Sequence, residues 1–454
     1  NNLKNTTPLW TWQALSAGLT GDSCNGPDIN GVGVDSRKIG LGELFIALPG
    51  DPGPRFNPSY RSDVDGHDYV TAAMQAGAAG AMVHKSRNQL QVPEDFPLLE
   101  VGDTYDGLWR LGRLARQRLS GDVVAVTGSS GKTTAKHFLT AALHAYAPPG
   151  SFNNHIGVPL SLANAPADSA AAVFEIGTNH PGEIEPLAEM VDADVAIVLN
   201  VHRAHIANFP SIDALRDEKL SLFNPLRDKS KAISEDMLGV GFGLTFGATD
   251  TADARVVELK GDKASIRFQN QTWQVRVPGG GLHRAKTVAA VLLACHLLER
   301  DLRSACELSA SVIPAGRGNL HTVDNVVLVD DSYNANPSSM QAALKSFAEL
   351  ASPQPKIAVI GEMLELGDEA DKAHLDLQAA LAPMDRVICV GEGSRALAQA
   401  LQAPWFAEAD EDLTGEILAA LAEGGSVLVK GSNRVFWARG YVSRLLTKLV
   451  SDAS

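Results

Sequence analysis

Residues that could carry phosphate chemistry are concentrated in one turn, Gly128-Ser129-Ser130-Gly131-Lys132-Thr133-Thr134. A β-branched apolar run, residues 123–126, leads into this turn, and apolar residues recur at helical spacing from 135 to 146. Between a strand and a helix, glycines let backbone N–H groups approach an anion, and the helix N-terminus adds partial positive charge. We therefore predict that the turn binds a nucleoside triphosphate, with Lys132 at the terminal phosphates and the Thr133 hydroxyl on a magnesium ion.

One position of the turn departs from the usual phosphate-binding loop. That pattern has a glycine five residues before Gly131, where this chain has Val126. An ordinary glycine-rich connection between a strand and a helix would also explain the glycines. The Gly-Lys-Thr-Thr ending favours the phosphate site.

Two further apolar runs are followed by polar side chains that could belong to the same site. Residues 171–176 contain Glu175 at their end, and residues 194–200 are followed by His202 and His205. Continuous apolar runs are typical of buried parallel strands, whose carboxyl ends line a site. Glu175 is placed to bind magnesium, although a solvated loop carboxylate is the alternative. Two histidines at the neighbouring strand end favour a role in the site over two ordinary loop positions.

Polar segments also follow two apolar strands near the C-terminus. Residues 330–337 (DDSYNANP) combine two acids with other hydrogen-bonding side chains and a proline, which favours a ligand-binding edge. A helix N-cap at Ser338 or Ser339 is compatible with that interpretation. Residues 430–434 place two cations near a glycine, where they could bind an anion.

Length and composition restrict the class of protein. A chain of 454 residues is too long for one ordinary core, so two to four domains are expected. Its 45% hydrophobic and 20% charged residues are typical of a soluble globular protein. The net charge of -14 argues against nonspecific binding to nucleic acid or to an anionic membrane.

The cysteines and the apolar segments indicate a cytoplasmic location. The four cysteines have no metal-binding or redox spacing, which favours reduced, mostly buried thiols: Cys24, Cys295, Cys306 and Cys389. Residues 1–8 are polar and do not resemble a secretory signal. Residues 287–298 form the longest apolar helix candidate and are too short to span a bilayer. We expect no membrane insertion.

The pattern of expected elements divides the chain into three α/β regions. Up to residue 118 we expect strands near 31–35, 44–48 and 81–83 and helices over 70–80 and 101–119. From 119 to 313, strands alternate with helices, and alternating polarity within 264–277 indicates a small antiparallel sheet. After the linker at 314–318, a second open sheet is predicted, with strands over 326–329, 356–360, 386–390 and 426–429 and helices including 338–350 and 413–422.

Together these segments resemble the Mur ligase family over nearly the whole chain. Residues 127–134 are similar to its ATP loop, in which the missing glycine at 126 is expected. Four segments resemble the MurF branch more specifically: 153–159 (NNHIGVP), 175–183 (EIGTNHPGE), 331–337 (DSYNANP) and 361–367 (GEMLELG). At the N-terminus, residues 35–37, 44–50 and 65–67 fit the UDP-binding module of the family.

The resemblance implies a fold and an activity. It implies an α/β protein with a UDP-substrate domain at 1–118, a P-loop ATP-binding domain with a parallel and a small antiparallel sheet at 119–313, and a Rossmann-like domain at 314–454. The last domain is expected to close on ATP and bind the incoming dipeptide. The implied enzyme is a cytoplasmic, monomeric, ADP-forming ligase of peptidoglycan synthesis. It adds D-alanyl-D-alanine to UDP-N-acetylmuramoyl-tripeptide through an acyl phosphate, with ATP and Mg²⁺.

The resemblance also implies roles for individual residues. Lys132 and Arg317 would hold the phosphates, Thr133 and Glu175 one magnesium ion, and His205 a second. The implied nucleotide-binding residues are Gly128, Ser129, Ser130, Gly131, Lys132, Thr133, Thr134, Arg317, Asp331, Tyr333 and Asn336. Of these, Asp331 would bind the ATP ribose. The implied contacts to the other substrates are Ser36, Arg37, Asn153, Asn154 and Asn334.

Lys219 lies where superfamily members carry a lysine that is often carbamylated, and a carbamate would offer magnesium an anionic oxygen. The implied catalytic residues are Lys132, Glu175, His205 and Lys219. A plain surface lysine on a helix remains open as the alternative for Lys219.

Two segments differ from the family pattern. Asparagines are usual near the adenine in an HN..N pattern, where this chain has Arg284 and Thr287, so no adenine contact is assigned to either. The loop at 51–64 is longer than usual, and we favour no substrate role for its Tyr60 and Arg61.

Three other functions share features with this one. A Mur ligase that adds the third residue is disfavoured, because the last domain has no Asp-Asn-Pro-Arg-like motif. A folylpolyglutamate synthetase should lack the segments at 153–159 and 361–367. A catalytically silent nucleotide-binding module would not need Lys132, Thr133, Glu175 and His205 together. The sequence leaves open whether the third peptide residue is diaminopimelate or lysine.

Overall fold

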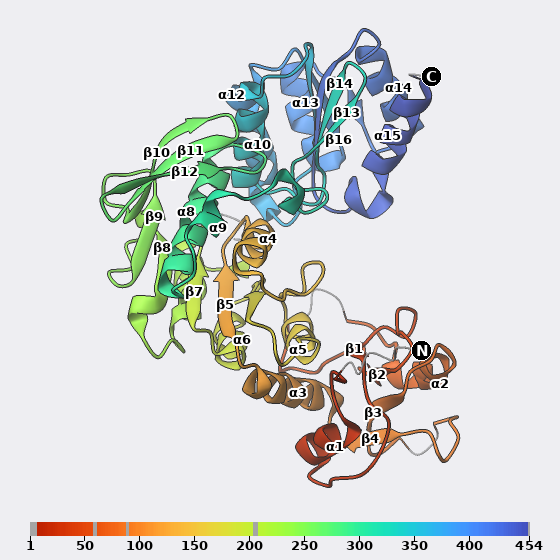
Figure 1. Cartoon of the computed structure of the whole chain (residues 1–454). Coiled ribbons are helices and arrows are strands. Elements are labelled where there is room, and N and C mark those ends of the chain that lie inside the picture. Colours follow the sequence, from red (N-terminus) through yellow and green to blue (C-terminus); the bar gives the residue numbers. More distant parts are fainter. Residues whose placement is uncertain (1–6, 58–60, 88–89, 203–207, 453–454) are drawn as a thin grey trace, which may run out of the picture. The chain divides into compact units, whose positions relative to one another are not determined.

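The computed structural model describes residues 7–57, 61–87, 90–202 and 208–452 (Figure 1). It contains two compact units, which are described separately. The first unit comprises Asn1–Val126, His144–Ala196 and Leu220–Arg227, and the second comprises Thr127–Leu143, Ile197–Lys219 and Asp228–Ser454. In the described part of the chain, no helix has the length and apolar character needed to cross a membrane.

The first unit begins with a parallel sheet in the order β1-β2-β3-β4. Its strands and the helices around it are β1 (Gly31–Gly33), β2 (Glu43–Ile46), β3 (Gly80–His84), β4 (Leu98–Val101), α1 (Trp12–Thr20), α2 (Val70–Gln75) and α3 (Thr104–Arg118). The side chain of Asp103 caps α3 by accepting a hydrogen bond from the Asp106 amide. Leu108, Leu111 and Ala115 then recur at helical spacing and are buried.

The rest of the first unit carries two strands of the predicted ATP-binding region. These are β5 (Asp122–Thr127) and β6 (Ala171–Glu175), with α5 (Gly157–Ala163) and α6 (Ile184–Val191). β5 pairs with β6 in parallel, and Val126 lies opposite Glu175 in the register. Both strands are apolar and almost fully buried, as the sequence predicts for parallel strands covered on both faces. β7 (Val195–Val198) has residues in both units.

The second unit begins with the phosphate-loop helix and a mixed sheet. Its elements are α4 (Lys132–Leu143), α7 (Ile212–Leu220), β8 (Ala232–Glu235), β9 (Leu244–Gly247), β10 (Ala254–Lys260), β11 (Lys263–Phe268), β12 (Gln271–Arg276), α8 (Leu282–Leu297) and α9 (Arg303–Cys306). β8, β9 and β10 are parallel, whereas β10, β11 and β12 form an antiparallel meander. α8 packs against β9, β10 and α4. The predicted small antiparallel sheet is therefore confirmed.

The C-terminal part of the second unit is an open sheet in the order β13-β14-β18-β15-β16-β17. Its strands are β13 (Asn319–Val323), β14 (Val326–Asp331), β15 (Lys356–Gly361), β16 (Arg386–Val390), β17 (Trp405–Phe406) and β18 (Gly425–Lys430). Only the pairing of β13 with β14 is antiparallel. The helices are α10 (Pro337–Glu349), α11 (Ala370–Leu375), α12 (Gln378–Leu381), α13 (Arg395–Leu401), α14 (Glu411–Ala420) and α15 (Tyr441–Asp452).

Two apolar cores cover this sheet. One contains side chains of α14 and α15, and the other contains side chains of α10 and α13. β18 lies between β14 and β15 and is parallel to both. The carboxyl ends of β14 and β18 are therefore adjacent, and the polar segments that follow these two strands begin side by side at that edge of the sheet. The predicted second open α/β sheet is confirmed, with β13 and β17 as edge strands that the sequence pattern did not predict.

Several helix boundaries differ from those predicted. The helix expected over 70–80 ends at Gln75, and the one expected over 101–119 begins at Thr104, because Asp103 caps it. α1 and β4 were not predicted. The division into domains at 118 and 313 stays a prediction.

Candidate active site

The phosphate-binding turn lies in the second unit, between β5 and α4. Gly131 has φ +80°, a conformation that glycine adopts without strain, and α4 begins at the next residue, Lys132. The Lys132 ammonium donates a 2.8 Å hydrogen bond to the Gly128 carbonyl and so closes the turn on itself. Thr133 is buried in the first helical turn. The predicted strand, turn and helix around the site are all present.

Asn200, just after β7, holds the turn in this shape. Its side-chain oxygen accepts a 3.0 Å hydrogen bond from the Ser130 amide, and its Nδ2 donates to the Ser130 carbonyl at 3.2 Å. The Asn200 carbonyl accepts from the Ser129 amide at 3.1 Å, and the Ser129 hydroxyl bonds both the amide and the carbonyl of His202. Asn200 was not among the predicted site residues. The signal that could have found it is a polar side chain directly after a buried apolar strand.

Lys219 is a buried lysine near the C-terminal end of α7, not a surface residue. Burial, together with the positive charge of Lys132, lowers the pKa of its ammonium to about 7, whereas Glu218 opposes the shift. The environment of Lys219 therefore favours the neutral amine far more than water does. A neutral amine is the form that can react with CO₂ to give a carbamate.

His202 provides a second perturbed group beside the turn. Burial lowers the pKa of its imidazole, the charges of Lys286 and Lys219 lower it further, and Glu235 raises it. Glu235 itself forms a 2.8 Å ion pair with Lys286 at the start of α8. The surroundings of His202 thus favour the neutral ring, which can ligate a metal ion. His205, the predicted ligand of a second magnesium ion, lies outside the described residues.

Within the first unit, Glu175 is fully buried at the end of β6. Glu175 lies opposite Val126 of β5, two residues before Gly128. β6, which carries the carboxylate, is therefore next to β5, the strand that precedes the phosphate-binding turn. Among the described residues, no three histidine, cysteine, aspartate or glutamate side chains gather into a metal site. Magnesium commonly takes only one or two protein ligands and completes its shell with phosphates and water. Thr133 in the second unit and Glu175 in the first are each a residue type that can supply magnesium with an oxygen.

The predicted substrate residues of the first unit have local hydrogen bonds. The Asn154 side chain accepts from the amides of Ile156 and Gly157 at 3.1 and 2.8 Å and so organises the start of α5. The Asn153 carbonyl accepts a 2.8 Å hydrogen bond from the Gly177 amide, just beyond β6.

Arg37 makes a two-point ion pair with Asp35 at 2.9 Å, and its side chain is 85% exposed. The guanidinium lowers the pKa of the Asp35 carboxyl. Ser36 lies between them in the chain.

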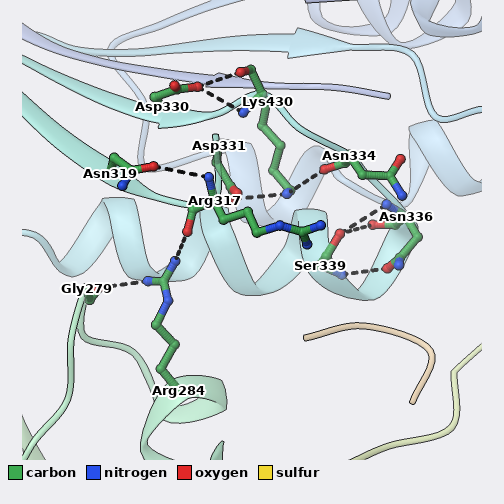
Figure 2. A network of polar contacts seen from close by, with 11 residues as sticks. Gly279, Arg284, Arg317, Asn319, Asp330, Asp331, Asn334, Asn336, Ser339 and Lys430 are labelled. Atoms are coloured by element: carbon green, nitrogen blue, oxygen red, sulfur yellow. Dashed lines mark hydrogen bonds and ion pairs between the residues drawn. The ribbon is translucent and has the colours of Figure 1, made fainter. Parts of the chain in front are cut away.

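The C-terminal part of the second unit brings several predicted residues together (Figure 2). Asp331 forms a 2.8 Å ion pair with Lys430, whose ammonium also donates to the Asn334 carbonyl at 3.0 Å. The Arg317 guanidinium lies 4.0 Å above the ring of Tyr333. Asp331, Tyr333, Asn334 and Arg317 therefore lie in one neighbourhood, and their roles toward ATP and the substrate stay a prediction.

One expectation for this region is untested and one is wrong. Anion binding by residues 430–434 stays a prediction, and the Lys430 ammonium forms an ion pair with the Asp331 carboxylate. The N-cap of α10 is Asn336, and not Ser338 or Ser339. Its side-chain oxygen accepts from the Ser339 amide at 2.9 Å, and the Ser339 hydroxyl accepts from the Asn336 amide at 3.0 Å in return.

The chain is similar to known proteins over most of its length. Residues 126–295 match the Mur ligase middle domain, and residues 316–433 match the Mur ligase glutamate ligase domain. The UDP-N-acetylmuramoyl-tripeptide–D-alanyl-D-alanine ligase of Escherichia coli (strain K12) is 32% identical over 429 residues, which cover 89% of this chain and 91% of that protein.

Solved structures give the same result. MurF from Acinetobacter baumannii superposes with a TM-score of 0.79 and 26% identity, covering 97% of this chain and 99% of that one. MurF ligase from Thermotoga maritima, in complex with ADP, superposes with a TM-score of 0.76 and 25% identity, covering 93% and 98%. The similarity is thus not confined to the phosphate-binding turn.

Proposed function

Because the chain belongs to the Mur ligase family, in its branch of UDP-N-acetylmuramoyl-tripeptide–D-alanyl-D-alanine ligases, we propose that it joins D-alanyl-D-alanine to UDP-N-acetylmuramoyl-tripeptide. The reaction consumes ATP, uses Mg²⁺, and serves peptidoglycan precursor synthesis. The observation that carries the proposal is the similarity to these ligases over 89% of the chain, in a protein whose phosphate-binding turn is intact. The predicted family and the predicted α/β fold are confirmed by the same similarities.

The chemistry requires the activation of a carboxylate. A carboxylate oxygen of the tripeptide attacks the γ-phosphorus of ATP, ADP leaves, and an acyl phosphate forms. The amine of D-alanyl-D-alanine then attacks the acyl carbon, phosphate leaves, and the attacking nitrogen loses a proton. The main tasks of the protein are to align these groups and to neutralise the phosphate charge.

The described residues can be given roles on this basis. Lys132 and Arg317 supply positive charge to the phosphates, and the turn from Gly128 to Thr134 supplies backbone N–H groups. Thr133 and Glu175 offer magnesium its protein oxygens. Support for these roles comes from the closed turn, from the burial of Glu175, and from the position of Arg317 beside Tyr333.

Lys219 acts, in this proposal, as a carbamate that provides a further anionic oxygen for magnesium. Support comes from its burial and from its pKa of about 7, which keeps a neutral amine available for reaction with CO₂. As a carbamate, the side chain would remove the repulsion that the free ammonium exerts on Lys132.

We also propose that the three regions divide the work. Residues 1–118 bind the UDP moiety, 119–313 bind ATP, and 314–454 close on ATP and bind the dipeptide. The enzyme acts in the cytoplasm as a monomer. Light scattering during chromatography at assay concentration should give the mass of one chain, about 48 kDa, and a dimer mass would contradict this part of the proposal.

A substrate panel tests the function directly. Phosphate release should require UDP-N-acetylmuramoyl-tripeptide and D-alanyl-D-alanine together with magnesium-ATP. If L-glutamate or a diamino acid replaces the dipeptide without loss of rate, the assigned reaction is wrong. Comparing tripeptides that end in diaminopimelate and in lysine identifies the third residue.

The separation of sites is tested by Lys132→Ala. Loss of the ammonium should abolish turnover, because the γ-phosphate loses a charge partner, whereas binding of the UDP substrate should stay within about threefold of wild type. Lys345→Ala is the matched control, because Lys345 is exposed on α10. Comparable loss of turnover and of UDP-substrate binding in Lys132→Ala would overturn the separation.

A further inference from the structure

Arg284 has surroundings that the proposed reaction does not explain. It lies in the first turn of α8, and its side chain is buried. One guanidinium nitrogen donates to the carbonyls of Gly279 and Gly280 at 2.8 and 3.4 Å, and the other donates to the Arg317 carbonyl at 2.9 Å. Figure 2 shows Arg284 between Gly279 and Arg317. The side chain therefore joins the turn before α8 to the linker before β13.

The buried charge has no carboxylate in direct contact. Within the described residues, Arg284 forms no ion pair, and the negative charge of Asp331 acts on it only at longer range. Burial, which removes water from the charged group, lowers the pKa of its guanidinium, and Asp331 only partly opposes this shift. A buried cation that is satisfied only by backbone carbonyls is costly compared with an apolar side chain of similar size. Simple packing does not account for an arginine here.

Glycines with positive φ lie where both backbone segments approach the guanidinium. Gly279 has φ +75°, and a Cβ atom there would lie 2.7 Å from Nη1 of Arg284. Gly318 has φ +93°, and a Cβ atom there would collide with Nη2. Two glycines in the left-handed region thus let two separate segments approach the same guanidinium.

The linker that Arg284 contacts is held on its other side by the C-terminal sheet. The Gly318 amide donates to the Asp330 carbonyl at 2.7 Å, and the Tyr333 amide donates to the Gly316 carbonyl at 2.9 Å. Arg317 lies between these two anchors, and its guanidinium lies over the ring of Tyr333. Arg284 is thus an anchor for the Arg317 backbone that comes from α8 and not from the C-terminal sheet.

We propose that Arg284 is a positioning residue that fixes the backbone of Arg317, so that the Arg317 side chain is presented to the phosphate being transferred. The inference rests on the proposed role of Arg317 at the phosphates. Arg284 touches none of the three substrates in this proposal. It acts through the Arg317 carbonyl, and its effect on the reaction should disappear when Arg317 can no longer act.

A double-substitution experiment on the full chain separates this role from a structural one. Arg284→Gln is made in the wild type and in Arg317→Lys, which keeps a charge and some activity but loses the planar guanidinium. kcat and KM for ATP are measured in the complete reaction, and unfolding is followed for each variant. Arg303→Gln is the matched control, because Arg303 is an exposed arginine that pairs with Asp301 away from the linker.

We expect Arg284→Gln to lower kcat at least tenfold in the wild type, with KM for ATP within threefold. In Arg317→Lys the same change should lower kcat less than twofold, because the two residues act as one unit. Arg303→Gln should leave both constants unchanged. If Arg284→Gln does not fold, Arg284→Lys is judged by the same criteria, since one ammonium cannot bridge both segments as the fork of a guanidinium does.

Two kinds of result would overturn the inference. Equal losses of kcat in the two backgrounds, or a change confined to KM for ATP, would show that Arg284 acts independently of Arg317, while the proposed role of Arg317 would survive. Full activity of Arg317→Lys and Arg317→Ala would remove the role of Arg317 itself, and the inference with it.

Discussion

Replacing Lys219 with methionine should stabilise the folded protein, and the gain should be larger at pH 6 than at pH 9. The Lys219 side chain is 1% exposed, and its pKa is lowered from 10.5 to about 7. Burial is the main cause, and the charge of Lys132 adds to it. The folded-state pKa is thus about 3.5 units below the unfolded-state pKa. At about 1.36 kcal/mol per unit, the charged Lys219 lowers the free energy of unfolding by roughly 5 kcal/mol below pH 7.

The sign of the pH dependence follows from proton binding. The folded-state pKa of Lys219 is below its unfolded value, so the unfolded chain binds more protons between pH 7 and 10.5. Stability conferred at this position therefore rises with pH across that window. At pH 9, about 1.5 of the 3.5 units remain, or roughly 2 kcal/mol. Methionine has a similar length and no charge, so the gain from the substitution should fall by about 3 kcal/mol between pH 6 and pH 9.

Urea unfolding in CO₂-free buffer at the two pH values measures this difference. Lys345→Met is the matched control, because that lysine is exposed on α10, and it should change the free energy of unfolding little and equally at both values. Equal gains at pH 6 and pH 9, or destabilisation at pH 6, would refute the argument that a buried ammonium costs stability here. Lys219→Met should lose ligase activity even though it is more stable. Added bicarbonate should not restore that activity, because methionine cannot form a carbamate.

Two further substitutions test the two ends of the nucleotide site. Asn200→Ala removes the side chain that hydrogen-bonds the amide and carbonyl of Ser130. If this loss costs about 1.4 kcal/mol of ATP binding in the transition state, kcat/KM for ATP should fall about tenfold. An unchanged kcat/KM would show that the turn keeps its shape without Asn200. Asp331→Asn leaves the buried Lys430 ammonium unpaired and should lower the free energy of unfolding by roughly 3 kcal/mol while raising KM for ATP. Asp330→Asn should have a much smaller effect, since burial already raises the pKa of that carboxyl and an amide oxygen can still accept from Ser332; equal effects in thermal unfolding and ATP titration would contradict this distinction.

The sequence predicts those parts of the protein that local pattern determines. The phosphate-binding turn, the buried strands and the C-terminal sheet follow from continuous apolar runs with polar ends. β13 and β17 were missed because β13 is a partly exposed edge strand and β17 has two residues. α1 was missed because a short helix near the chain end carries only a weak periodic signal.

The contacts that shape the site depend on strand order, which local pattern does not contain. Arg284 meets Arg317 across 33 residues, and Asn200 meets Ser130 across 70. Both contacts require the fold to bring separate segments together. The sequence shows that Arg284 and Asn200 are polar. No spacing in the sequence identifies the residue that each of them contacts.

The adjacent acids Asp330 and Asp331 show how strand register then assigns function. Successive side chains of a strand face opposite sides of a sheet, so two neighbouring aspartates cannot share one environment. In the parallel pairing of β14 with β18, Asp331 lies opposite Lys430, and the two side chains form their ion pair. Asp330 lies opposite Val429 and accepts a hydrogen bond from the Ser332 hydroxyl at 2.5 Å. A slip of one residue would exchange the two faces. The apolar cores on both sides of the sheet fix that register, and through it they determine which of the two carboxylates pairs with Lys430.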